Sequence, residues 1–188
     1  MYFDSQNFIT LSDSAPLPSS ALIATIDFNL KETMYDVSEA ALCESLIFPV
    51  LQDVWKHFKE NLFLWSHTSI EADENLIGIP DYLIAKKSEY GRILGMPLLT
   101  TVEAKKDNFE DGWTQCTAQM VGMQKMNVEK GNYTIYGIVT NGELWEIARL
   151  QDTQLVKNTT AYTIFDLPQL YAVLYGVLDA CNKQILTH

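Results

Sequence analysis

The spacing of hydrophobic residues changes several times along this 188-residue chain, and these changes limit the folds that it can adopt. Between Ser38 and Glu60 the apolar residues recur at helical spacing, Ser38 is a suitable N-cap, and Pro49 could kink the helix. The segments that follow are rich in branched and aromatic residues, which favour β-strands. Helical spacing then returns twice. This alternation predicts an α/β fold with a mixed β-sheet.

The predicted elements follow the order helix, three strands, helix, hairpin and helix. Asn141-Gly142, between two strand-like segments, is the strongest hairpin signal in the chain. Pro168 begins the last helix, where its missing N–H costs little. The predicted strands cover 61–70, 76–85, 97–104, 133–140 and 143–150, and the two later helices cover 112–128 and 167–185.

Residues 1–37 are expected to form a lead-in segment that packs partly on the core, because they include the polar, proline-bearing stretch SDSAPLPSS. Residues 38–188 are expected to form a single domain, a length that allows a sizeable core. Three widely spaced cysteines without a CxxC pattern indicate reduced thiols. There is no secretory signal pattern and no apolar run near the ~20 residues of a membrane span, so we expect a cytoplasmic protein without membrane contact.

The net charge of −11 argues against a free-standing protein that binds nucleic acid tightly. Non-specific affinity comes from Lys and Arg, and the chain has 13 of these against 24 acidic residues. An enzyme that acts on DNA weakly, transiently or with a partner is still compatible with this charge. The best local basic cluster could contact a phosphate backbone or form a solvated loop, and it contains Lys86, Lys87, Arg92, Lys105 and Lys106.

Three acidic or basic residues fall on the pair of predicted strands 76–85 and 97–104. Asp81 lies in the first strand, and Glu103 and Lys105 are separated by one residue in the second, which puts them on one face. The two carboxylates, with a backbone carbonyl such as that of Ala104, could hold a hard cation through oxygen ligands. Such a cation lowers the pKa of a bound water and neutralises charge on a phosphate, while the lysine orients or activates the water. This pattern favours metal-dependent phosphodiester hydrolysis.

The same residues resemble the signature of the PD-(D/E)xK nuclease superfamily, in the order Pro80-Asp81 and then Glu103-Ala104-Lys105. The segment Ser38-Glu39-Ala40, followed by Leu46-Ile47-Phe48-Pro49, resembles the opening helix of the nuclease domain in type I restriction enzyme R subunits. The resemblance implies a restriction-endonuclease-like core, with a central mixed β-sheet flanked by helices on both faces. It also implies a hydrolase that cuts DNA in restriction, defence or repair, either as a homodimer or within a larger complex.

The resemblance assigns roles to individual residues. Its opening helix supplies an extra acidic residue, which would be Glu39 or, as second choice, Glu44. A glutamine in the helix after the Glu-x-Lys strand faces the active site, and Gln115 matches best, with Gln119 one turn on. The implied cofactor is Mg²⁺, with Mn²⁺ as an alternative. The implied metal ligands are Asp81, Glu103 and Glu39, and the implied catalytic residues are Lys105, Glu103, Asp81 and Gln115.

Each of these residues also has a purely structural interpretation. Glu103 and Lys105 could form an exposed cross-strand ion pair, which contributes little to stability. Asp81 could simply follow a strand-edge proline, Glu39 could complement the helix dipole, and Gln115 could be a surface residue. The three histidines lack ligand spacing, so a zinc site is not expected. For the whole chain, the alternatives are a catalytically inactive member of the fold that serves as an interaction or regulatory module, and a structural domain without a site.

Overall fold

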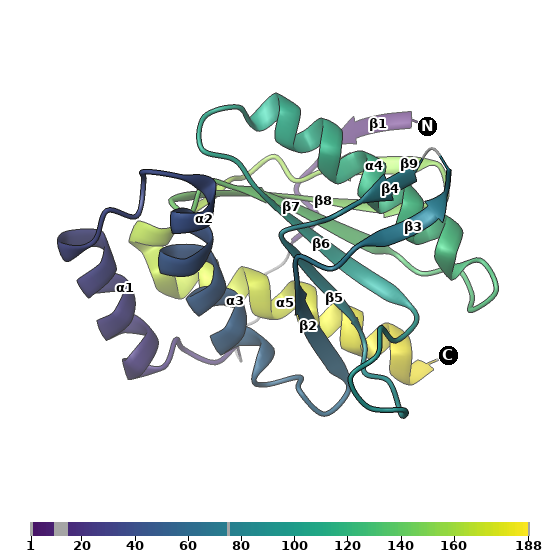
Figure 1. Cartoon of the computed structure of the whole chain (residues 1–188), viewed down its shortest axis with the longest axis horizontal. Helices are drawn as coiled ribbons and strands as arrows, with labels where there is room; N and C mark the ends of the chain where they lie inside the picture. The colour runs from purple at the N-terminus through teal and green to yellow at the C-terminus, as the bar shows by residue number, and fades with distance from the viewer. Residues whose placement is uncertain (1, 10–14, 75, 188) are drawn as a thin grey trace.

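The computed structural model describes residues 2–9, 15–74 and 76–187, and within them a mixed eight-stranded sheet forms the centre of the fold (Figure 1). Its strand order is β1-β9-β8-β7-β6-β5-β2, and β10 pairs with the beginning of β8. Neighbouring strands are antiparallel, except for the parallel pairs β6–β7 and β1–β9. The strands are β1 Tyr2–Ser5, β2 Leu62–Ser66, β5 Tyr82–Lys86, β6 Leu98–Ala104, β7 Ile135–Thr140, β8 Leu144–Gln151, β9 Gln154–Lys157 and β10 Tyr162–Thr163.

Helices pack on both faces of this sheet and form two apolar clusters. Tyr82 and Ile84 of β5 belong to one cluster, and Leu83 and Ala85 belong to the other, as the alternation of a strand requires. The first cluster includes residues of α1 (Ser20–Glu32), α2 (Glu39–Leu42), η1 (Cys43–Ile47), α3 (Phe48–Trp55) and α5 (Leu167–Thr187). On the opposite face α4 (Phe109–Asn127) packs against the sheet, together with a small two-stranded sheet of β3 (Ile70–Asp73) and β4 (Leu76–Gly78). The predicted α/β fold with a central mixed sheet is confirmed.

The helix predicted from Ser38 contains a π-helical segment, η1, in its middle and ends at Trp55 rather than at Glu60. Pro49 has no N–H and therefore cannot bond to the carbonyl of Ser45 one turn earlier. The side chain of Asn29 in α1 satisfies this carbonyl instead, with its Nδ2 2.7 Å from the Ser45 oxygen. Pro49 thus leaves the Ser45 carbonyl without a partner within its own helix, and Asn29 of α1 binds this carbonyl. The chain continues as a helix on both sides of the proline.

The lead-in segment is more regular than its composition indicated. Residues 20–32 form the helix α1, and Ser19 caps it by accepting a hydrogen bond from the Leu22 N–H. Ser19 also donates from its backbone N–H and its hydroxyl to the buried carboxylate of Asp53 in α3, at 3.1 and 3.0 Å. Residues 10–14 of the proline-bearing stretch lie outside the described residues. The segment is therefore tied to the core by a specific polar contact.

Two predicted strands are each divided in the structure. The predicted strand 61–70 becomes β2 and the start of β3, because His67 adopts a positive φ of 49° that ends the extended chain. The predicted strand 76–85 becomes β4 and β5, with Pro80 between them. Asp81 therefore does not lie inside a strand, as predicted, but directly before β5. The short strands β1, β9 and β10 were not predicted.

The second half of the chain follows the prediction more closely. The hairpin at Asn141-Gly142 is confirmed: the Asn141 side chain accepts N–H bonds from Glu143 and Leu144, and Gly142 has φ 83°. Helix α4 begins three residues before its predicted start, because the side chain of Asn108 caps it. The last helix is confirmed.

The segment Ile164–Thr187, which contains α5, is long and apolar enough to cross a membrane by length and composition alone. Half of its most apolar stretch is buried inside the protein. Leu170, Val173, Leu174 and Val177 on this helix belong to the apolar cluster beneath the sheet. In this fold α5 is thus a core helix, a class that also meets the length and composition test.

Candidate active site

Strand β6 forms the floor of the candidate site. It lies between β5 and β7, and all of its residues from Leu98 to Ala104 are buried. Glu103 is 6% exposed, in a strand where most neighbours are apolar. The structural alternative of an exposed ion pair therefore does not apply to Glu103, since a carboxylate this deep needs specific partners.

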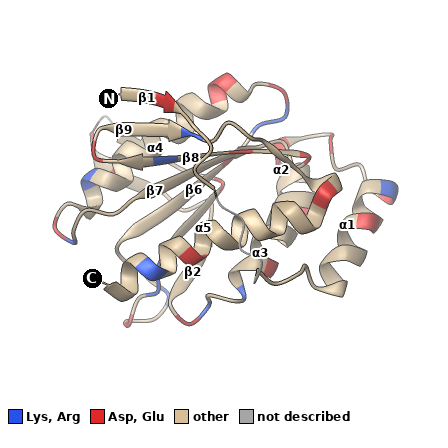
Figure 2. Cartoon of the chain, turned by 180° about the vertical axis from the view of Figure 1, so that it is seen from behind, with Lys and Arg blue, Asp and Glu red and all other residues tan. Residues whose placement is uncertain are grey.

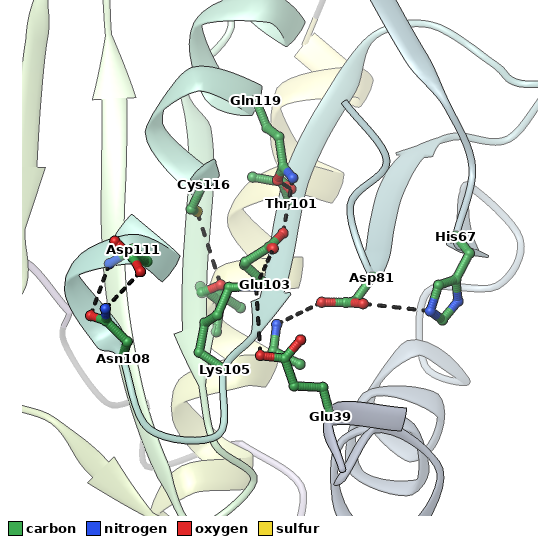
Figure 3. A network of polar contacts seen from close by, with 12 residues as sticks. Glu39, His67, Asp81, Thr101, Glu103, Lys105, Asn108, Asp111, Cys116 and Gln119 are labelled. Atoms are coloured by element: carbon green, nitrogen blue, oxygen red, sulfur yellow. Dashed lines mark hydrogen bonds and ion pairs between the residues drawn. The ribbon is translucent and has the colours of Figure 1, made fainter. Parts of the chain in front are cut away.

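Lys105 follows the last residue of β6 and turns its ammonium back toward Glu103 (Figure 3). Its Nζ lies 3.2 Å from Glu103 Oε1 and 3.7 Å from Glu39 Oε1. Burial alone would lower the pKa of Lys105, but the hydrogen bond and charge of Glu103 and the charges of Glu39 and Asp81 outweigh it and raise the pKa. The lysine therefore carries its positive charge at neutral pH.

Helix α4 comes close to this lysine because residue 112 is a glycine. A Cβ atom at Gly112 would lie 2.8 Å from Lys105 Cγ and 2.7 Å from Val139 Cγ1. Any larger residue would push the helix away from the lysine or the lysine away from Glu103. Gly112 thus fixes the path of the Lys105 side chain.

Asp81 is held at the end of β6 by a backbone hydrogen bond. The N–H of Ala104 donates to Asp81 Oδ2 at 2.8 Å, which brings the carboxylate next to the Glu-x-Lys segment. Burial raises the pKa of Asp81, and this bond together with the charges of His67 and Lys105 offsets only part of that effect. The charge of Asp81 in turn contributes to the raised pKa of Glu103, although burial is the largest cause. The two carboxylates therefore share a partly buried space that disfavours two negative charges.

The glutamine that contacts the site is Gln119, the second of the two proposed. Its Nε2 donates to Glu103 Oε2 at 2.9 Å, and its Oε1 accepts a 2.5 Å hydrogen bond from the Thr101 hydroxyl (Figure 3). Gln115, the preferred residue, is exposed one turn earlier, at the rim of a cavity that also reaches Glu103. Gln119 has both ends of its amide occupied, so it fixes the orientation of Glu103.

Of the two proposed helix carboxylates, Glu39 reaches the site. It is the first residue of α2, and its carboxylate lies beside the Lys105 ammonium. The hydroxyl of Tyr82, the residue after Asp81, donates to the Cys43 carbonyl at 3.1 Å and so ties this helical stretch to β5. Glu44 is exposed on the following turn.

His67 is a site residue that the sequence analysis missed. Its backbone N–H donates to the Asp81 carbonyl at 3.0 Å, and its Nε2 lies 3.5 Å from Asp81 Oδ1. Its other ring nitrogen, Nδ1, is 2.8 Å from the Ser66 hydroxyl. The pairing of β2 with β5 brings His67 to the site. These strands are antiparallel and Ser66 lies opposite Tyr82, so His67, the residue after Ser66, lies opposite Asp81, the residue before Tyr82. Ligand spacing along the chain could not show it.

The local charge is strongly negative. The carboxylates of Asp81, Glu103 and Glu39 surround one ammonium, that of Lys105. In the described part of the chain, no group of three or more His, Cys, Asp or Glu residues is arranged to hold a metal ion. Two carboxylates completed by water and substrate oxygens are, however, the usual donor set for Mg²⁺. Asp81 and Glu103 fit such an open site, because a cation between them would relieve their mutual repulsion.

The predicted basic cluster does not form one patch. Tyr82 at the start of β5 lies opposite Val102, so the far end of β5, with Lys86 and Lys87, is remote from Lys105. Lys87 donates instead to the Lys59 carbonyl at 3.0 Å. Antiparallel pairing separates the two halves of the cluster to opposite ends of the strand pair.

The candidate site thus combines residues from five segments: α2, the end of β2, the start of β5, the end of β6 and helix α4. A search of protein-family models and of characterised proteins finds no match to this chain. The chemistry of the site is therefore inferred from its own geometry.

Proposed function

We propose that this chain is a metal-dependent nuclease-like hydrolase of DNA with a restriction-endonuclease-like core. The observation that carries the proposal is the group of three carboxylates near the partly buried ammonium of Lys105. The order of the elements supports it: a helix with Glu39, a strand preceded by Asp81, a strand with Glu103, and a helix with a glutamine facing that strand. This order is the pattern described for the PD-(D/E)xK superfamily above.

In this proposal each residue has a separate task. Asp81 and Glu103 hold a divalent cation, Mg²⁺ or Mn²⁺, whose chemistry when bound is to acidify a water and to neutralise charge on the phosphate. Lys105 donates a hydrogen bond to the attacking water or to a phosphate oxygen, and Glu39 keeps the ammonium in position. Gln119 holds one oxygen of Glu103 so that the other faces the site.

Cleavage of DNA by the purified chain tests the proposal. Wild type, Asp81→Asn and Lys105→Ala are compared on single-stranded, duplex and flapped DNA in Mg²⁺ and in Mn²⁺. We expect cleavage by wild type in the presence of metal and a loss of at least about 100-fold in both variants, the scale of losing an electrostatic group in the reaction. The matched control is Lys106→Ala, which removes an exposed lysine beside the site.

The outcomes separate the possible explanations. Equal cleavage by all four proteins would reveal contaminating nuclease and contradict the assigned roles. A defect in Lys106→Ala as large as that in Lys105→Ala would point to general loss of DNA affinity instead of catalysis. No cleavage of any substrate would reject the hydrolase.

The second candidate is a catalytically inactive member of the fold that binds a partner. The observation that favours it is the net charge of −11, which leaves few cations to hold a nucleic acid. In that case the acidic site would serve as a binding or regulatory surface. Partner binding without cleavage, weakened in Asp81→Asn, would support this candidate over the first.

A further inference from the structure

A cavity of about 280 Å³ lies between helix α4 and the small sheet β3–β4 and reaches the candidate site. Glu103 contributes to its wall, so the cavity and the carboxylates share one residue. Two glycines let the small sheet approach the helix: a Cβ at Gly78 would meet Gln119 Cγ at 3.3 Å, and one at Gly122 would meet Ala72 Cβ at 3.6 Å. The width of the cavity is therefore set by how closely the backbones of α4 and of the small sheet approach each other.

The wall of the cavity exposes polar and apolar atoms in about equal measure. Ile77 and Ile79, two residues of the cavity lining, are each 61% exposed. The amide of Gln119 is already bonded to Thr101 and Glu103, whereas Gln115 is exposed at the rim. Glu103 carries the only charge among the residues described around the cavity. A flat, uncharged group with polar edges fits these walls better than an ion does.

The net charge of the chain also favours recognition of an uncharged group over recognition of phosphates. With 13 basic residues against 24 acidic ones, phosphate contacts can supply little of the affinity for a nucleic acid. Stacking of a base on side chains and hydrogen bonds to its edge do not depend on cations, so they can supply the missing part. A base inside a Watson–Crick pair cannot enter a cavity of this size, and only an unpaired one can.

We infer that this cavity receives an unpaired nucleobase of the substrate strand, next to the phosphate that lies at Lys105. This inference rests on the proposed function, and it deepens it by naming the substrate as single-stranded or locally unpaired DNA. Ile77 and Ile79 contact the face of the base, and the Gln115 amide bonds its edge. The site would then select its substrate by whether a base is free to leave the strand.

Binding of a fluorescent base analogue tests this inference without requiring cleavage. A short single strand with one 2-aminopurine, the same sequence as a duplex, and a single strand with one abasic position are titrated in Ca²⁺ with wild type, Ile79→Ala, Gln115→Ala and Ala118→Phe. Ala118 is an exposed residue of the cavity wall, so phenylalanine there fills the cavity and leaves the core unchanged. Ile93→Ala is the matched control, since Ile93 is 54% exposed in the loop before β6.

We expect the single strand to bind at least about fivefold more tightly than the duplex, the scale of burying one methylene-sized apolar group. Ala118→Phe and Ile79→Ala should each lower the affinity for the single strand by about the same factor. The 2-aminopurine fluorescence should change on binding only with wild type and Ile93→Ala. Equal binding of single strand and duplex, unchanged binding by Ala118→Phe, or no binding at all would overturn the inference. Binding of the base without hydrolysis in any metal would support base binding in the cavity and contradict the proposed nuclease activity. Equal cleavage by wild type and Ala118→Phe would support the nuclease activity and contradict base binding in the cavity.

Discussion

His67 adopts a left-handed backbone conformation that few residues with a side chain adopt. Such conformations cost on the order of 1–3 kcal/mol and persist where the surroundings fix them. Here the surroundings are Asp81, which His67 contacts through both its backbone N–H and its ring. The strain is thus located beside the residue that we assign to metal binding.

Two substitutions at His67 separate its backbone from its ring. His67→Gly removes the ring but suits the positive φ, so we expect a free energy of unfolding within about 1 kcal/mol of wild type. His67→Ala keeps the strain and should be the less stable of the two. Both should weaken Mn²⁺ binding, measured by calorimetry, by roughly 10- to 100-fold, as for other residues that orient a ligand.

The control for these variants is His57→Ala, which breaks a 3.0 Å contact with the Tyr171 hydroxyl within the other helical layer. It should lower stability and leave Mn²⁺ affinity unchanged. Unchanged metal affinity in both His67 variants would show that His67 has no part in holding Asp81.

Residues on the predicted strand pair could be assigned to the site from the sequence, whereas His67, which reaches Asp81 through the pairing of β2 with β5, could not. Glu103 and Lys105 are separated by one residue, so their common face could be predicted. Gln119 was ranked after Gln115 because Gln115 matches the glutamine of the resembled family best. The two glutamines are one turn apart on the same side of α4, so helical spacing could not decide between them, and the packing of α4 on β6 determines that Gln119 reaches Glu103.

At the level of elements, α1 is attached to α3 through the carboxylate of Asp53. Burial, the largest influence, raises the pKa of Asp53, but hydrogen bonds from Ser19 and the ion pair with Lys56 outweigh it, and the pKa is lowered overall. The folded state therefore binds fewer protons than the unfolded state near the ordinary Asp pKa of about 3.9. The stabilisation is complete above that pH and is lost as the pH falls through the lower folded-state pKa.

Asp53→Asn should lower the free energy of unfolding by about 1–3 kcal/mol at pH 7, because two hydrogen bonds to a charge are weakened. The difference between wild type and variant, measured by urea unfolding, should shrink as the pH falls below about 4. Asp27→Asn is the matched control, since its pair with Lys31 within α1 is mostly exposed and should matter little at any pH. A difference that does not change with pH would contradict the ionic role of Asp53.

The order of the main elements could be predicted because each long segment keeps one hydrophobic period. The division of the strands 61–70 and 76–85 could not, because it depends on backbone dihedral angles at His67 and on Pro80. The edge strand β1 is equally hidden: its residues are all exposed, and they form a strand only because β9 offers a free edge. The pairing of β1 with β9 cannot be predicted from the local composition of either segment.

For the whole molecule, acidity is the dominant property. Basic residues are sparse on the face shown in Figure 2. Divalent cations will therefore associate weakly with much of the surface, and any metal effect on stability must be assigned to the site by substitution.

Mg²⁺ at about 100 times its dissociation constant should stabilise wild type by about 2.7 kcal/mol. Thermal unfolding in Mg²⁺, in Mn²⁺ and in EDTA, at constant ionic strength, measures this. In Asp81→Asn the metal-dependent shift should vanish. Without metal the variant should be at least as stable as wild type, because burial raises the pKa of Asp81 and its charged form therefore costs stability at neutral pH. An equal shift in both proteins would place the metal on the general surface.

The close contact between Gly112 and Lys105 has a consequence for how this chain can change over generations. A side chain at position 112 would meet both Val139 and Lys105, so the glycine is expected to persist wherever these two residues are kept. Relatives that keep the chemistry should therefore show Glu-x-Lys, a glycine and a glutamine at the spacing found here. Relatives with a larger residue at position 112 should also have a smaller residue at position 139.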